Sequence, residues 1–407
     1  MEYFLRYDAH WDEIKSAPLN PDIRMYNVPR LSFEGQQKDV SDSGYWFGEQ
    51  DPAWETFSAP GYCFARALQP VLDVPVGIIG CNWGGTPACA WVSEETLAAN
   101  EALHVFLDEY EEAVRDRDPA LLRKESLLAA AFDDSGAHQA EWRSMMYGLS
   151  REEQLRWMEE HAGDPAVPMG PLNACRPCGL YHRMLEPLAP FSLKGVLWYQ
   201  GESDAAHAAL YDTMFSALIG CWRKLWDDAL PFLFVQLAPF GEWLDCTSEG
   251  YPEVRRRQEL VSKTVPGAHM TSIMDLGMYW DIHPKHKREV GERLALLARG
   301  CVYGEDLLCE CPEFLSASRE DRTVRLSFLH AGTGLALRGS SVSGLTVRCG
   351  KVPCEPLAVQ VLGDSLYLEF SALPPQPVEV SLAEEGYAEV NLFNSAQLPA
   401  KPFSCTV

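Results

Sequence analysis

The sequence predicts an α/β protein in which a parallel sheet carries helices on both faces and a smaller antiparallel β domain follows. One observation is Val196–Tyr199, an apolar run without polar alternation, as expected for a central strand covered on both faces. A second is the alternation of apolar strand patterns with amphipathic helical patterns up to about Glu305. A third is the short alternating strands after that point, which are separated by Gly, Asp-Ser and Pro-Pro turns.

These patterns divide the chain into two predicted domains, residues 1–305 and residues 306–407. Within the first domain, residues from about 94 to 165 are charged and rich in Glu, Arg and Leu, after a capping signal at Ser93. We interpret them as a helical insertion. It is either a lid that shapes substrate choice or a solvated helical hairpin that braces the sheet.

The elements of the first domain follow one another in a simple order. Apolar residues of Met1–Ser16 recur at near-helical spacing, and a doubly wound domain would normally begin with a strand before them. The remaining predicted elements are strand 23–28, helix 61–72, strand 76–79, helix 207–226, strand 232–237, helix 253–260, a strand ending at 271–275 and helix 282–300. In the second domain we expect strands at 324–328, 345–348, 358–361, 365–370 and 378–380.

Composition excludes several classes of function. A chain of 407 residues with 47% hydrophobic and 23% charged residues is typical of a globular protein. A net charge of -24 argues against binding to nucleic acid or to an anionic membrane surface. No apolar run approaches the roughly 20 residues that span a bilayer. Because the N-terminus also lacks a signal-peptide pattern, we expect a cytoplasmic protein.

The 13 cysteines are odd in number and scattered, which favours small buried hydrophobes in a reducing compartment over a disulfide framework. Cys175 and Cys178 have the spacing of half a zinc site, but no second pair matches them. The sequence therefore predicts no metal.

Three stretches carry the polar side chains and glycines expected of an active site. Gln200-Gly201-Glu202 follows the central strand, where parallel strands deliver side chains to a ligand crevice. Trp83–Pro87 is a glycine turn whose backbone can approach a substrate closely. Asp281-Ile282-His283-Pro284 is predicted to open a helix, with Pro284 in its first turn. Together they offer a base, an acid and donors to an oxyanion.

In their order along the chain and in their residues, these blocks resemble the motifs of the sialate O-acetylesterase family of the SGNH hydrolases. The matching segments are Trp83–Pro87, Trp198–Ser203 and Ile282–Lys285. The resemblance implies a flavodoxin-like parallel sheet and removal of O-acetyl groups from sialic acid or a related sugar, with no metal or organic cofactor. An acetylxylan esterase and a non-catalytic glycan-binding pseudoenzyme remain as alternatives.

The resemblance also implies roles for single residues. His283 would be the general base. The acid is open between Asp281 and Asp275, because SGNH enzymes commonly carry it three residues before the His, where this chain has Trp280. The expected oxyanion donors are Gly84, Gly85 and Gln200, and the expected substrate-binding residues are Glu202, Arg176 and Tyr181.

The nucleophile is the departure from the family. There, a first strand ends in Gly-Gln-Ser-Asn-Met, and Met1 aligns with that Met. We therefore expect the nucleophilic serine two residues ahead of Met1, and this chain by itself to be inactive or nearly so. Ser203 in Gly201-Glu202-Ser203-Asp204-Ala205 approximates a nucleophile elbow, but a helix N-cap is the favoured interpretation.

Overall fold

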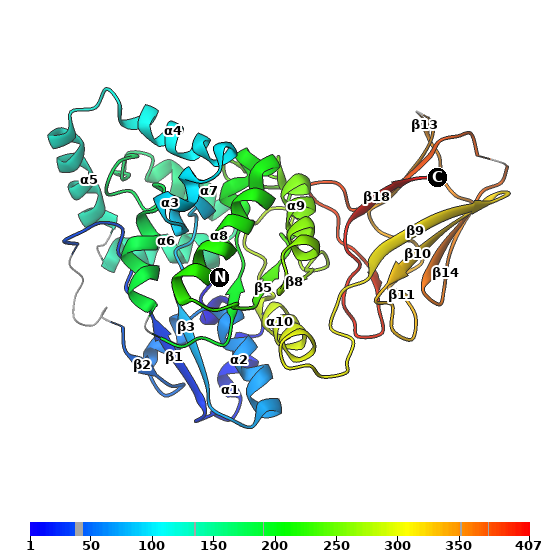
Figure 1. Cartoon of the computed structure of the whole chain (residues 1–407), viewed down its shortest axis with the longest axis horizontal. Helices are drawn as coiled ribbons and strands as arrows, with labels where there is room; N and C mark the ends of the chain where they lie inside the picture. Colours follow the sequence, from blue (N-terminus) through cyan, green and yellow to red (C-terminus); the bar gives the residue numbers. More distant parts are fainter. Residues whose placement is uncertain (37–43, 134–135, 190, 351, 373) are drawn as a thin grey trace.

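The computed structural model describes residues 1–36, 44–133, 136–189, 191–350, 352–372 and 374–407. An α/β lobe is followed by a separate β lobe (Figure 1). The chain passes between them after helix α10 (Lys287–Cys301) and before strand β9 (Glu313–Glu320), the interval that contains the predicted boundary at 305. None of the helices in these described ranges is long and apolar enough to cross a membrane.

Where the sequence predicts one sheet, the described part of the α/β lobe contains two three-stranded sheets and a separate pair of β6 (Glu242–Trp243) and β7 (Cys246–Thr247). In the first, β1 (Ile23–Asn27) pairs in parallel with β3 (Val76–Gly80) and antiparallel with β2 (Trp46–Phe47). The second is all parallel, in the order β4 (Val196–Trp198), β5 (Phe232–Val235), β8 (Ala268–Thr271). The prediction of strands and helices is confirmed, but the described strands β3 and β4 do not pair with each other.

An apolar cavity lies between the unpaired edges of β3 and β4. Every residue of both strands lines it, together with Phe64 from α2 (Ala59–Leu72) and Trp222 from α8 (Tyr211–Trp226). Its effect is visible in burial, since all four residues of β5 are buried whereas four of the five in β3 are not. The apolar side chains of β3 are therefore less buried than a continuous apolar run predicts for a central strand.

Helices cover the sheets on both faces, as predicted. On one face α2 and α10 lie in close contact, because a Cβ added at Gly291 would come within 2.6 Å of Cys63. On the other, the aromatic side chains of α8 pack on β4 and β5; Phe215 stacks with Trp198 at a centroid distance of 5.6 Å. Helix α9 (Tyr251–Thr264) joins this layer.

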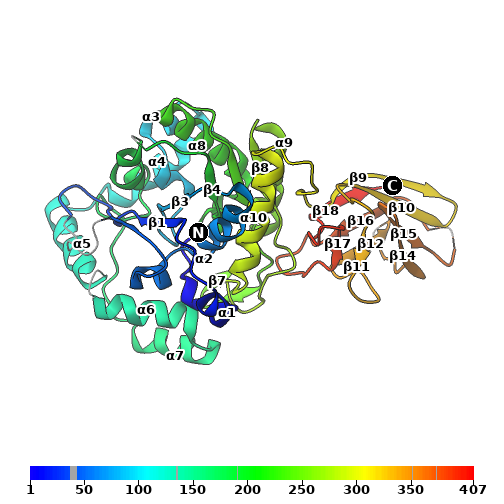
Figure 2. The ribbon, with the colours of Figure 1, turned by 90° about the horizontal axis from the view of Figure 1, so that it is seen from below.

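The insertion is helical throughout its described part. Its helices are α3 (Glu94–Ala98), α4 (His104–Val114), α5 (Pro119–Asp133), α6 (Gly136–Gly148) and α7 (Arg151–Glu160). Ser150 and Glu153 form a complete capping box at the start of α7. Seen from below, α6 and α7 lie along one side of the lobe next to α1 (Trp11–Ser16) (Figure 2).

The β lobe is antiparallel, as the sequence predicts. One sheet has the order β14-β15-β10-β9 and another the order β13-β12-β16-β18, with a separate pair of β11 and β17. The remaining strands are β10 (Thr323–Leu329), β11 (Ala336–Leu337), β12 (Leu345–Cys349), β13 (Val352–Pro353), β14 (Ala358–Leu362), β15 (Ser365–Glu369), β16 (Val378–Leu382), β17 (Leu392–Phe393) and β18 (Phe403–Thr406). The edge strands β9 and β18 were not predicted. No residue of β9 and only one residue of β18 is buried, so these strands lack a clear apolar pattern in the sequence.

The predicted start of one helix is wrong. The helix expected from Ile282 begins at Lys287, because the carboxylate of Asp281 accepts the N–H of His283 and closes a turn there first. Cys349 and Cys354 are bonded across the β12–β13 hairpin, and the other 11 cysteines are free.

Candidate active site

The cavity between β3 and β4 extends to the carboxyl ends of these strands, where the three predicted blocks meet. Its volume is about 1080 Å³. Five of the predicted site residues line it: Gly84, Gly85, Gln200, Glu202 and His283. The turns that follow β3 and β4 bring the first four together, and His283 reaches the same space from the turn before α10.

His283 is held by Asp281. The imidazole Nδ1 lies 3.1 Å from Oδ1 of Asp281, and the backbone N–H of His283 donates to the same oxygen at 2.8 Å. When Nδ1–H donates to the carboxylate, Nε2 is left as the proton acceptor, which is the tautomer a general base requires. The other candidate acid, Asp275, makes two 2.6 Å bonds to Arg293 instead.

Two aromatic rings enclose this imidazole. Tyr147 from α6 and Trp243 from β6 (Glu242–Trp243) both meet it edge to face, at centroid distances of 5.2 and 4.9 Å. Trp243 donates its indole N–H to Gln154 of α7 at 3.0 Å. The insertion therefore contributes directly to the wall around His283, which favours the lid over the hairpin that only braces the sheet.

The glycine turn offers one free donor. The N–H of Gly84 donates to Glu2 at 2.6 Å, and the same carboxylate pairs with Arg30. Gly85 has a φ of 77°, and its N–H makes no hydrogen bond to any residue the structure describes. Of the two predicted backbone donors, Gly85 is thus the one available to an oxyanion in this conformation.

Gln200 is used to hold the turn. Its side-chain amide donates to the carbonyl oxygen of Thr86 at 3.2 Å and to the carboxylate of Asp204. Burial raises the pKa of Asp204 to about 6, although the hydrogen bonds from Gln200 and from the N–H of Ala88 work against this. In this conformation Gln200 joins the end of β4 to the glycine turn.

The sequence analysis missed Lys287, a buried cation in the first turn of α10. Its Nζ lies 3.4 Å from the hydroxyl of Tyr199 and above the rings of Tyr199 and Tyr3, at 4.7 and 5.0 Å from their centroids. Burial lowers its pKa to about 8, against the opposing charges of Glu202 and Asp281. A lysine four residues after the motif histidine has no sequence signal that separates it from a surface lysine.

Two predicted substrate-binding residues lie outside the cavity lining. Arg176 donates to the carbonyl oxygen of Ser32 at 3.4 Å, and Tyr181 is buried with its ring edge to face against His182. Ser203 does line the cavity and is exposed. It is not the predicted N-cap, because the 3-10 helix Glu202–Leu210 is capped by Gly201.

Residues 176–298 match the family model described as carbohydrate esterase, sialic acid-specific acetylesterase. The sialate O-acetylesterase of Rattus norvegicus is 31% identical over 267 residues, which are 61% of this chain and 43% of that protein. The corresponding enzyme of Mus musculus is 27% identical over 331 residues, covering 72% of this chain and 52% of that protein.

In sequence, this chain is similar to the sialate O-acetylesterase family. It spans about half the length of these two relatives. Among solved structures, a carbohydrate acetylesterase from Xanthomonas citri superposes with a TM-score of 0.69 at 28% identity, covering 100% of this chain and 78% of that one. The recognition of the family from the three sequence blocks is therefore confirmed.

The family block Gln200-Gly201-Glu202 depends on its glycine. Gly201 has a φ of 146°, and an added Cβ would lie 3.1 Å from Val254 and 3.3 Å from Gln258. We expect Gly201→Ala to lower the free energy of unfolding by about 2 kcal/mol, through backbone strain, when measured by chemical denaturation. Gly220→Ala is the matched control, since no neighbour lies within 4 Å of the new Cβ in α8. It should raise stability by about 0.5 kcal/mol, and an equal loss in both variants would contradict the role of Gly201.

Proposed function

We propose that the protein hydrolyses O-acetyl esters on sugars, with O-acetylated sialic acid as the preferred class of substrate. The observation that carries the proposal is the His283–Asp281 pair, which faces a large cavity shared with the glycine turn. The description of the matching family model supports sialic acid over xylan as the sugar.

In the proposed mechanism a serine hydroxyl attacks the acetyl carbonyl carbon while Nε2 of His283 takes the hydroxyl proton. Asp281 stabilises the imidazolium that forms, and the N–H of Gly85 donates to the oxyanion. His283 then returns the proton to the departing sugar oxygen. A water molecule, activated by His283 in the same way, releases acetate from the acyl-enzyme.

The serine of this mechanism is proposed to precede Met1. In the part of the chain that the structure describes, no serine hydroxyl bonds to His283. The backbone nitrogen of Met1 donates to the carbonyl oxygen of Tyr199 at 2.9 Å, at the carboxyl end of β4. A strand placed in the cavity between β3 and β4 would complete one SGNH-like parallel sheet and end beside His283.

The test compares two proteins, this chain from Met1 and the same chain preceded by the residues that its gene encodes in frame upstream. We expect the longer protein to release acetate from O-acetylated sialic acid at least about 1,000-fold faster, since it alone carries the nucleophile. Acetylated xylan is assayed in parallel, and faster release from xylan would select the acetylxylan esterase.

A stop codon directly upstream, combined with binding of the acetylated sugar and no acetate release, would favour the glycan-binding pseudoenzyme. Equal activity of both proteins would reject the proposed position of the serine. In that case Ser203→Ala decides whether Ser203 is the nucleophile, because it lines the same cavity.

A further inference from the structure

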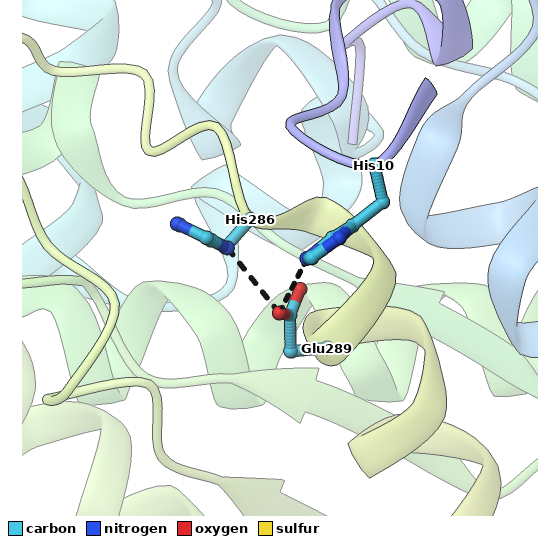
Figure 3. A group of neighbouring side chains, drawn as sticks. All are labelled: His10, His286 and Glu289. Atoms are coloured by element: carbon cyan, nitrogen blue, oxygen red, sulfur yellow. Dashed lines mark hydrogen bonds and ion pairs between the residues drawn. The ribbon is translucent and has the colours of Figure 1, made fainter. Parts of the chain in front are cut away.

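Three side chains outside the cavity converge on one point at the start of α10. They are His10, from the turn before α1, His286, the residue that precedes α10, and Glu289, from the first turn of α10 (Figure 3). Oε1 of Glu289 lies 2.8 Å from Nε2 of His10 and 3.2 Å from Nδ1 of His286. All three atoms lie within 4.8 Å of one another.

We propose that His10, His286 and Glu289 bind a divalent transition cation of the Zn²⁺ class. Two imidazole nitrogens and one carboxylate oxygen are a ligand set that such ions prefer. In a tetrahedral site with bonds of about 2.0 to 2.1 Å, neighbouring ligand atoms are about 3.3 Å apart. The two separations from Glu289, 2.8 and 3.2 Å, need to lengthen by about 0.5 Å or less, and the two imidazole nitrogens already lie within 4.8 Å of each other.

The backbone holds the two segments together without relying on these three side chains. The carboxylate of Asp8 accepts the N–H of His10 at 2.8 Å and the N–H of Arg288 at 2.9 Å. The N–H of Ala9 donates to the carbonyl oxygen of Lys285 at 2.9 Å. The turn that carries His10 is therefore docked on the start of α10, and the ligand set is positioned in advance.

The charges around the cluster also favour a cation. Oε2 of Glu289 is buried and has no hydrogen-bond partner within the described ranges. The Nδ1 of His10, on the ring edge away from the cluster, lies 3.8 Å from Glu13, the outer carboxylate that ligating histidines commonly have.

A bound ion would join two segments that line the active-site cavity. Residues 8–10 lead back to Tyr3 and Glu2 in the cavity wall, and α10 carries Lys287. The ion would act as a structural clamp between them. No spacing rule finds this site in the sequence, because 276 positions separate His10 from His286.

The test is a titration of the chelator-treated full chain with Zn²⁺ and with Co²⁺, followed by calorimetry, thermal unfolding and visible absorption. We expect one ion per chain, a higher unfolding temperature, and Co²⁺ bands without thiolate charge transfer. His286→Gln and Glu289→Gln should each weaken binding by about 100-fold or more, since even the loss of an outer partner costs 10- to 100-fold. His286 is exposed, so its replacement leaves the fold intact.

His182→Gln is the matched control. His182 also lies between two carboxylates, but Glu94 and Glu186 contact opposite ring nitrogens and cannot share an ion with it. This variant should bind as the unmodified chain does. Unchanged Zn²⁺ affinity in a His10→Gln/His286→Gln double variant would overturn the proposal, as would a thiolate band with Co²⁺ or no binding at all. None of these outcomes depends on esterase activity.

Discussion

Replacing Asp281 by asparagine is expected to lower kcat for acetate release by about 10,000-fold while leaving the fold intact. The carboxylate lies 3.1 Å from Nδ1 of His283, and an asparagine can present its amide N–H there instead. The imidazole would then protonate at Nε2 and could no longer accept the serine proton. The assay uses the protein with its upstream residues, and ¹⁵N NMR of His283 reports the tautomer in either form of the chain.

Asp275→Asn is the control that separates the two acids left open by the sequence. Asp275 is paired with Arg293, and both side chains are about 10% exposed. Its replacement leaves a buried guanidinium without its carboxylate, so stability should fall by about 3 kcal/mol while kcat changes less than about tenfold. If Asp275→Asn abolished turnover and Asp281→Asn did not, the assignment of the acid would be reversed.

Much of the fold was predictable because the local pattern of apolar residues agrees with the burial of each strand in the structure. The unalternating runs at β4 and β5 indicate buried parallel strands, and both form. The alternation at β10 and β15 indicates strands of an antiparallel sheet, and these pair in register. The failure at β9 has the same origin, because an edge strand exposed to solvent has little apolar pattern to detect.

The site was predictable where it rests on short segments and unpredictable where distant segments meet. His283 and Asp281 are two residues apart, so a single turn brings them together. Glu2 reaches the N–H of Gly84 although 82 positions separate them in the sequence, and this contact removes a donor that the motif alone leaves free. The rings of Tyr147 and Trp243 come to His283 from separate elements, which no spacing of residues encodes.

Replacing Lys287, the buried cation of α10, is expected to have a large effect on stability. Its pKa in the folded chain is about 8, below the ordinary value of 10.5. At pH 7 the lysine is charged in both states, and a pKa lowered from 10.5 to about 8 means that the charged form costs about 3 kcal/mol in the fold. Lys287→Met should therefore raise the free energy of unfolding by about that amount at pH 7, as measured by denaturant titration.

The pH dependence of stability tests independently whether the buried charge of Lys287 destabilises the fold. Between pH 8 and 10.5 the unfolded chain binds more protons at this lysine than the folded chain does, so the penalty is full below pH 8 and fades as pH rises. The gain from Lys287→Met should shrink over the same range. Lys285→Met, a change at a neighbouring half-buried lysine, is the matched control and should alter stability little at pH 7.

A lysine retained at such a cost calls for a reason outside stability. Its charge faces Glu202 and Asp281, and the latter holds the imidazole of His283. We therefore expect Lys287→Met to lower the rate of acetate release even as it raises stability, the trade-off that strained functional groups produce. A variant that is both more stable and fully active would show that the charge of Lys287 does not contribute to acetate release. Loss of stability at pH 7 would instead show that its contacts with Tyr199 and Tyr3 outweigh its desolvation.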